Sequence, residues 1–397
     1  MSLTKLFELN EIARKDAARY SRKRFIYSEL KKCKDRRFIS LIGPRGVGKT
    51  VLLRQLALEN ENSFYVSMDA FEEENLFDFA KVLSEKYRIK FLLIDEIHFL
   101  KKYDAELKKI FDFLDINIVF TSSVAVSLYE SSYDLSRRVK IIKIYPFSFR
   151  EYVYFKQGKN PAPLSIRDIF DAKWTSEHLK LGYLFEEYLK GGLFPFYLEN
   201  FEVMDVVKNI LGKIISRDIP LFANLKMDEI NLIEKTFRFI SVSPVEGINY
   251  SSVSKNVGIT KHKAEQYINL LEKAFVINSV MPYGTNVLKE PKVLMCLPFR
   301  LLNKGYQESL GALREDFAVE CLKMRGYEVL YLKSKRGAKT PDFFIREKDE
   351  KFVIEVGGKG KGRSQFKDFK EYSKITFAHA DVLNDDLKRH LFLLGYL

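Results

Sequence analysis

The chain is poor in cysteine. Its 397 residues include only Cys33, Cys296 and Cys321, which lie far apart and show no metal-ligand spacing. Such usage excludes a disulfide framework and a cysteine zinc site. It is typical of a reducing compartment, so we expect a cytoplasmic protein.

Long apolar runs are also missing. No stretch approaches the roughly 18 apolar residues of a membrane-spanning helix, which excludes an integral membrane protein. The first residues are charged and helix-like, so we expect no secretory signal. Neither internal repeats nor low-complexity tracts occur. With 46% hydrophobic and 30% charged residues, the composition is that of a globular protein, and the length suggests about two to four domains.

Positive charge is in excess. Sixty-six Lys and Arg against 53 Asp and Glu give a formal net charge of +13. This excess favours a polyanionic partner, which can be nucleic acid, nucleotide phosphates or an acidic protein surface.

Short apolar runs alternate with amphipathic segments in the first part of the chain. This alternation predicts an α/β domain with a parallel sheet covered by helices on both faces. The predicted strands are residues 38–42, 64–67, 91–94, 116–120 and 141–144.

A complete G-x-x-x-x-G-K-T motif follows the first predicted strand and precedes a helical segment. Its glycines allow backbone N–H groups to surround phosphates, and the helix amino terminus favours anions. Lys49 is expected to reach the β- and γ-phosphates of ATP, and the Thr50 hydroxyl to bind Mg²⁺. The motif consists of Gly43, Pro44, Arg45, Gly46, Val47, Gly48, Lys49 and Thr50.

Two consecutive carboxylates end the third predicted strand, beside the phosphate loop. We expect Asp95 to hold Mg²⁺ and Glu96 to polarise the attacking water, which favours hydrolysis over simple nucleotide binding. At the end of the next strand, Ser122 or its neighbours Thr121 and Ser123 can contact the γ-phosphate or orient the water.

Arg138 precedes the last strand and can offer a guanidinium to the γ-phosphate, within one subunit or across an interface. His98 follows the acidic pair, but a lone histidine is more often structural, so no role is assigned to it.

The second part of the chain is mostly helical at first. Residues 149–226 predict helices with a break at Gly191, Gly192 and Pro195. Helices then follow at residues 228–240, 251–257 and 261–275, with a strand after them, and this order suggests a winged helix. Gly258 is expected to end the second of these helices. The remaining segments predict a helix at residues 313–325 and strands at residues 327–332, 342–345 and 352–356.

With these motifs the chain resembles the AAA-like P-loop ATPases of bacteria and archaea that carry an uncharacterised carboxy-terminal domain. The resemblance implies an ATPase domain of the additional-strand class at residues 1–148 and a helical lid at 149–226. It further implies a winged helix at 227–286 and a restriction-endonuclease-like domain at 287–397. The matching segments are residues 43–50, 93–97, 121–123, 135–139, 145–151, 191–195, 291–293 and 311–317.

The last domain offers a candidate nuclease site. Asp342 and Glu355 on adjacent strands can hold Mg²⁺, and Glu315 can add a third carboxylate. The family pattern places a lysine two residues after the glutamate, where this chain has Gly357. Lys359 is the nearest lysine after it, so the domain either cleaves nucleic acid or has kept only a binding role.

Three functions therefore compete. The first is an ATP-hydrolysing switch or motor whose carboxy-terminal domains bind nucleic acid or a protein. The second is an ATP-regulated, metal-dependent nuclease, and the third is a DNA-binding regulator that uses ATP only as a ligand. Polar and basic side chains that can contact nucleic acid are Lys261, His262, Lys263 and Gln266 at the start of the longest winged-helix helix, with further lysines and arginines at residues 333–339 and 359–367.

Overall fold

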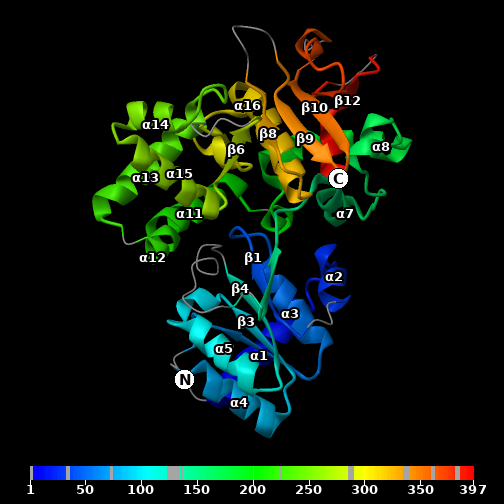
Figure 1. Cartoon of the computed structure of the whole chain (residues 1–397). Helices are drawn as coiled ribbons and strands as arrows, with labels where there is room; N and C mark the ends of the chain where they lie inside the picture. The colour runs from blue at the N-terminus through cyan, green and yellow to red at the C-terminus, as the bar shows by residue number, and fades with distance from the viewer. Residues whose placement is uncertain are drawn as a thin grey trace. The chain divides into compact units, whose positions relative to one another are not determined.

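The chain forms two compact units, Met1–Pro146 and Phe147–Leu397 (Figure 1). Within the part that the structure describes, no helix is both long and apolar enough to cross a membrane. The structure, a computed structural model, describes residues 3–32, 36–71, 75–122, 135, 137–199, 201–223, 225–284, 290–333, 340–358, 363–380 and 385–397.

The first unit contains a five-stranded parallel sheet with the order β2-β3-β4-β1-β5. All five predicted strands are confirmed. Strand β4 lies between β1 and β3, which is the strand order that the resemblance to the additional-strand class implied. The strands are β1 (Phe38–Ile42), β2 (Ser63–Ser67), β3 (Phe91–Asp95), β4 (Asn117–Ser122) and β5 (Val139–Lys143).

Helices cover both faces of this sheet. Alternate residues of the central strands, among them Leu92, Ile94 and Phe120, share a core with α4 and α5 on one face. Helices α1 and α3 pack together, and α3 contacts β2, β3 and β4 on the other face. The helices of this unit are α1 (Leu3–Ala17), α2 (Ile26–Lys32), α3 (Lys49–Glu59), α4 (Leu76–Tyr87), α5 (Tyr103–Phe113) and the 3₁₀ turn η1 (Ile97–Phe99).

The second unit contains a seven-stranded mixed sheet with the order β12-β11-β10-β9-β8-β6-β7. The sequence predicted separate winged-helix and nuclease-like domains, but β6 pairs with β7 on one side and with β8 on the other, so both segments share one sheet. The strand predicted at residues 327–332 is only two residues long. The strands are β6 (Ile277–Pro282), β7 (Lys292–Met295), β8 (Leu330–Tyr331), β9 (Phe343–Glu347), β10 (Glu350–Gly357), β11 (Ser373–Ala378) and β12 (Lys388–His390).

Three helices precede β6: α13 (Met227–Val242), α14 (Tyr250–Val257) and α15 (Lys261–Lys273). The antiparallel pair β6–β7 follows them. Gly258 has a φ of 77°, and its N–H donates to the Ser254 carbonyl, so it ends α14 as predicted. The order and lengths of these elements match the sequence prediction closely because their apolar periodicity and caps are strong local signals.

Residues 149–226 form helices, but the first part does not stand apart as a lid. The Leu164 N–H donates to the Tyr396 carbonyl, and the Phe149 ring lies 5.6 Å from the Tyr396 ring. The predicted break is present at Gly191, which has a φ of 128°. This segment therefore shares a core with the end of the chain. Its helices are α7 (Phe149–Gln157), α8 (Ile166–Phe170), α9 (Ser176–Lys180), α10 (Phe185–Glu187), α11 (Val203–Lys213) and α12 (Ile219–Phe222), and the later elements it meets are α16 (Tyr306–Met324) and η8 (Leu391–Tyr396).

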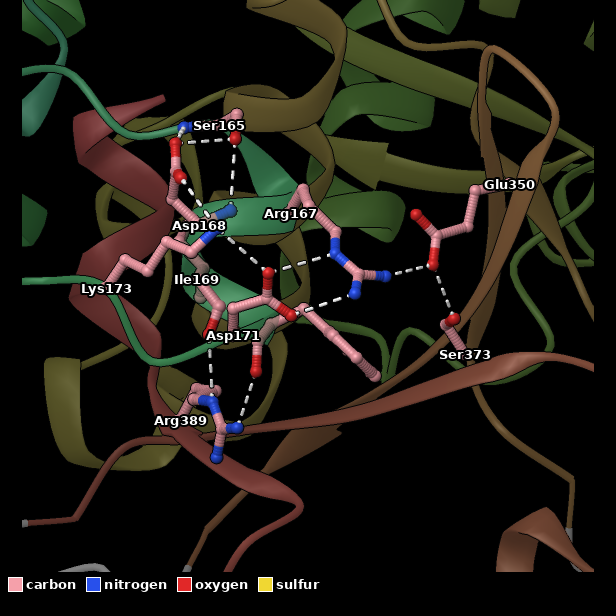
Figure 2. Close-up of polar contacts among 10 residues, drawn as sticks. Ser165, Arg167, Asp168, Ile169, Asp171, Lys173, Glu350, Ser373 and Arg389 are labelled. Atoms are coloured by element: carbon pink, nitrogen blue, oxygen red, sulfur yellow. Dashed lines mark hydrogen bonds and ion pairs between the residues drawn. The ribbon is translucent and has the colours of Figure 1, made fainter.

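Polar contacts tie α8 to the carboxy-terminal strands. Figure 2 shows Arg167 reaching Glu350 of β10, with Arg167 Nη1 2.5 Å from Glu350 Oε1. Arg389 of β12 donates from Nε to the Ile169 carbonyl (2.9 Å) and from Nη2 to the Phe170 carbonyl (2.6 Å). The exposed ion pair contributes little by itself, but the carbonyl bonds satisfy the orphan end of a short helix. Residues about 220 positions apart in the chain are thereby held together.

A buried ion pair joins the three-helix segment to α16. Arg300 and Asp316 are each almost fully buried, and Arg300 Nε lies 2.7 Å from Asp316 Oδ2. Arg300 Nη1 also donates to the carbonyls of Ile240, Ser241 and Ser243, beyond or at the end of α13. Asp316 accepts a further bond from the Met295 N–H. One guanidinium thus connects a helix end with α16.

We expect Arg300→Met to lower the free energy of unfolding of the second unit by about 3–5 kcal/mol, because it leaves the Asp316 charge buried without its partner. The measurement is the denaturation midpoint in urea. Arg238→Met, at an exposed position of α13, is the matched control and should change the midpoint little. Equal midpoints for both variants would contradict the prediction.

Candidate active site

The phosphate loop starts directly after β1, where the chain passes closely beside β5. A Cβ atom on Gly43 would lie 2.0 Å from the Ile144 carbonyl oxygen, so only glycine fits there. Gly46 and Gly48 have φ angles of 82° and 86°, in the left-handed region that favours glycine. The three glycines of the loop are therefore explained by backbone geometry, and Gly48 caps the amino end of α3.

Lys49 is the first residue of α3 and is only 6% exposed. Its Nζ donates to the carbonyls of Gly43 and Pro44, each at 2.8 Å. The ammonium group is thus held against the loop, beside the backbone N–H groups at the helix amino terminus. Thr50 follows in the first turn of the same helix.

Arg24 bonds to the backbone of this loop. Its Nη1 donates to the carbonyls of Val47 (2.9 Å) and Tyr145 (2.8 Å), which joins the loop to the end of the unit. The sequence assigns no role to Arg24. No local pattern marks a side chain that binds carbonyls more than 20 and 120 residues away.

The acidic strand end lies beside β4, as parallel strands require. Ile94 is opposite Phe120 in the register, which places Asp95 next to Thr121. Thr121 Oγ1 donates to Asp95 Oδ1 at 2.5 Å and accepts a bond from the Glu96 N–H at 2.9 Å. Thr121 therefore contacts both acidic residues.

Ser122 is fully buried and lies opposite Ile42 at the start of the loop. Ser122 therefore lies beside the loop. Its role in contacting the γ-phosphate or orienting the water stays a prediction. Ser123 lies outside the described residues.

Tyr65 is a site residue that the sequence did not indicate. It lies in β2, and its hydroxyl donates to Asp95 Oδ2 at 3.0 Å. Burial, and next the charge of Asp95, raise the pKa of Tyr65 well above its usual value, so the hydroxyl stays protonated and acts as a donor. The sequence predicted only a strand here, because no local pattern shows which side chain of a neighbouring strand the tyrosine hydroxyl contacts.

Glu96 begins the turn after β3 with a φ of 51°. Its carboxylate lies 3.9 Å from Arg45 Nη1 of the phosphate loop and 3.3 Å from His98 Nδ1. The His98 side chain is almost completely buried. His98, to which the sequence assigned no role, is therefore a neighbour of the expected water-activating residue, and the 3₁₀ turn η1 produces this contact two residues along the chain.

Thr50 and Asp95 are the residues that would hold Mg²⁺. Mg²⁺ is usually bound by one or two carboxylates together with substrate phosphates, and it supplies charge neutralisation of the transferred phosphoryl group. The donor set here fits, because a buried carboxylate, bonded to Thr121 and Tyr65, ends β3 at the edge of the sheet where the phosphate loop begins.

Arg138 is not brought to the phosphate loop of its own chain. It precedes β5 at the amino edge of the parallel sheet, and Phe38 is opposite Val139 in the register. One strand length, roughly 15 Å, separates that edge from the loop. Arg138 instead makes two bonds to Asp112, with Nε 3.0 Å from Oδ1 and Nη2 3.1 Å from Oδ2. This placement argues against a contact within one subunit, and the contact across an interface stays a prediction.

The three carboxylates of the candidate nuclease site do come together in the second unit. Glu315 lies on α16, Asp342 lies just before β9 and accepts a bond from the Val356 N–H at 2.8 Å, and Glu355 is fully buried in β10. Burial, and next the charges of Glu315 and Glu355, raise the pKa of Asp342 to about 7.

The lysine in this cluster is Lys292 of β7. Its Nζ lies 2.6 Å from Glu315 Oε2, and its charge partly offsets the rise in the pKa of Asp342. The sequence proposed Lys359, which lies outside the described residues. Among the described residues, no group of three or more His, Cys, Asp or Glu side chains is arranged to hold a metal ion. The acids of this cluster thus do not fit a metal in their present arrangement.

Comparison with known proteins identifies the first unit. Residues 35–153 match the family described as "AAA domain", and residues 182–296 match a domain of unknown function, DUF8612. The Walker-type ATPase paby2304 of Pyrococcus abyssi is 15% identical, with a TM-score of 0.37 over 72% of this chain and 94% of that chain. A score of this size carries no argument about function.

Relatives extend over most of the chain. An uncharacterized protein of Haemophilus influenzae is 27% identical over 85% of this chain and 87% of that protein. The uncharacterized protein MJ1637 of Methanocaldococcus jannaschii is 30% identical over 96% of this chain and 90% of that protein. This similarity shows that the chain belongs to the family of the M. jannaschii protein, and residues 35–153 with their phosphate loop make it an AAA-like P-loop ATPase.

Proposed function

We propose that this chain binds ATP and Mg²⁺ at residues 43–50, hydrolyses ATP with Glu96 as the water-activating residue, and uses its nucleotide state to control binding by the second unit. The observation that carries this proposal is the Thr121 hydroxyl between the two acidic residues, bonded to Asp95 and to the Glu96 backbone. It holds one carboxylate for the metal, and it orients the backbone of the next residue at the same sheet edge as the loop.

The partner of the second unit is proposed to be nucleic acid or a protein. Charge and the contacts of the basic side chains are the features relevant to this choice. The net charge of +13 favours a polyanion. We interpret α13, α14, α15 and the pair β6–β7 as a winged helix. However, the first lysines of α15 are already paired, Lys261 with Glu290 (2.5 Å) and Lys263 with Glu229 (2.9 Å). Exposed pairs of this kind are weak and exchange readily, so phosphates can compete for both lysines.

The experiment that tests the proposal is phosphate release from ATP with Mg²⁺, measured alone, with duplex DNA and with single-stranded DNA. Turnover that depends on Glu96 and rises with DNA supports a nucleic-acid-coupled ATPase. Turnover that depends on Glu96 but is unchanged by DNA supports a protein partner. Absence of Glu96-dependent turnover, with ATP still bound, would favour the regulator that uses ATP only as a ligand.

A metal-dependent nuclease is the second candidate, because Asp342 interacts with Glu315, Glu355 and Lys292 in one cluster. Since these acids do not fit a metal in their present arrangement, this function would require the cluster to rearrange around Mg²⁺. If the second unit cleaves DNA with Mg²⁺, Asp342→Asn should reduce the cleavage rate at least about 100-fold, since the variant loses a carboxylate ligand. The rate is measured on labelled duplex DNA, with Asp349→Asn at an exposed position as the matched control. Cleavage that persists in Asp342→Asn would rule the nuclease out.

A further inference from the structure

The side chain of Asp95 is held by two hydroxyl groups from different strands. Thr121 of β4 donates to Oδ1 at 2.5 Å, and Tyr65 of β2 donates to Oδ2 at 3.0 Å. Each carboxylate oxygen thus has its own donor, one from each neighbouring strand of β3. A carboxylate fixed at both oxygens presents a defined lone pair to a ligand, and such supporting bonds strongly affect metal affinity.

Tyr65 is in turn held by helix α1, which precedes the sheet in the chain. The Tyr65 N–H donates to Asn10 Oδ1 at 2.9 Å, and Asn10 is buried. The Arg54 guanidinium of α3 lies over the Tyr65 ring at 5.4 Å and donates to Asp16 Oδ2 of α1 at 2.6 Å. Backbone and ring are therefore both positioned through contacts with α1.

Tyr65 also borders a pocket. A pocket of about 510 Å³ between α1, α3 and β2 is lined by Tyr65 and Arg54, together with apolar residues of α1 such as Leu6 and Ala13. The polar contacts of Tyr65 include a hydroxyl bond to Asp95, a backbone bond to Asn10 and the Arg54 guanidinium over the ring.

We infer that Tyr65 is a positioning residue for the metal carboxylate Asp95, and that α1 holds Tyr65 in place through Asn10 and Arg54. This inference rests on the proposed function, since it assigns a support to the same Mg²⁺ site. It makes α1 a support of the nucleotide site through Tyr65, whose hydroxyl is bonded to Asp95.

The test is Mn²⁺ binding in the presence of a nonhydrolysable ATP analogue, followed by electron paramagnetic resonance. Tyr65→Phe removes the hydroxyl and keeps the ring, so the dissociation constant for Mn²⁺ should rise about tenfold. Affinity for the analogue without metal should stay unchanged, because the phosphate loop is untouched. Asn10→Ala, which leaves the hydroxyl in place, should raise the Mn²⁺ constant by a smaller factor.

Tyr27→Phe is the matched control. Tyr27 is another buried tyrosine of the same unit, and its hydroxyl donates to the Gln55 carbonyl at 3.3 Å, with no bond to Asp95. If Tyr65 has only a structural role, Tyr65→Phe and Tyr27→Phe should both lower the melting temperature and should bind Mn²⁺ with the same dissociation constant. That result would overturn the inference.

Two further outcomes separate the inference from the proposed function. If Asp95→Asn loses Mn²⁺ while Tyr65→Phe binds it as the unmodified protein does, the positioning role is wrong and the Mg²⁺ site stands. If the unmodified protein fails to bind the analogue, or Asp95→Asn binds Mn²⁺ normally, the proposed site itself is wrong and the inference fails with it.

Discussion

Replacing Lys49 by alanine is expected to weaken ATP binding at least about 100-fold. Lys49 is buried at the loop, and its Nζ lies 2.8 Å from two loop carbonyls, beside the phosphate position. Hydrogen bonds to charged groups contribute about 1.5–3 kcal/mol each, and every 1.4 kcal/mol is tenfold in affinity, so two lost bonds to phosphate correspond to at least this factor. The measurement is a titration with a fluorescent ATP analogue.

Lys86→Ala serves as the control for Lys49→Ala. Lys86 is an exposed lysine in the last turn of α4, so this variant removes the same charge from the protein without touching the loop. Its affinity should equal that of the unmodified protein. Because Lys49→Ala also removes two bonds within the loop, its melting curve must be compared with that of the control. An unchanged affinity in a folded Lys49→Ala protein would falsify the assignment of the nucleotide site.

Replacing Glu96 by glutamine is expected to lower ATP turnover by about 10²–10⁴-fold, the usual contribution of a general base. Binding should persist, because Lys49, Asp95 and Thr121 are unchanged and the Glu96 backbone keeps its bond to Thr121. The variant should therefore retain bound ATP. Phosphate release measures the turnover, and the nucleotide recovered from denatured protein after incubation with ATP and Mg²⁺ measures the retention.

Glu85→Gln, at an exposed position of α4, is the matched control for Glu96→Gln. It neutralises one carboxylate of the same unit and should leave turnover unchanged. Equal turnover in Glu96→Gln and in the unmodified protein would contradict the water-activating role. In that case the nearby His98, whose Nδ1 lies 3.3 Å from the Glu96 carboxylate, becomes the next residue to test.

Local signals predicted most of the first unit. The five strands, the phosphate loop after β1 and the acidic pair after β3 all follow from short patterns: apolar runs, glycines at required backbone angles and carboxylates at a strand end. Parallel strands end at one edge of a sheet, so the sequence also predicted that loop and acids meet. These features depend on residues that are close together in the chain.

Other parts of the site depend on contacts between distant residues. Thr121 and Tyr65 reach Asp95 only because β4 and β2 flank β3, and Arg24 reaches the loop from a segment about 20 residues earlier. The same holds in the second unit, where Lys292 pairs with Glu315 of the acidic cluster although the sequence pointed to Lys359. The domain boundaries predicted in the second unit also depend on distant contacts. Strand β6 extends the carboxy-terminal sheet, and residues 149–199 pack on the last residues of the chain.

The sequence alone therefore determined the proposal of nucleotide chemistry for this protein, since the phosphate loop and the two acidic residues lie in contiguous segments that match a known motif. The tertiary structure decided which side chains support that chemistry. It placed Arg138 at the far edge of the sheet, Tyr65 and Thr121 on the two oxygens of Asp95, and His98 beside Glu96. Strand order and side-chain direction create these contacts, and neither is encoded in any local pattern of residues.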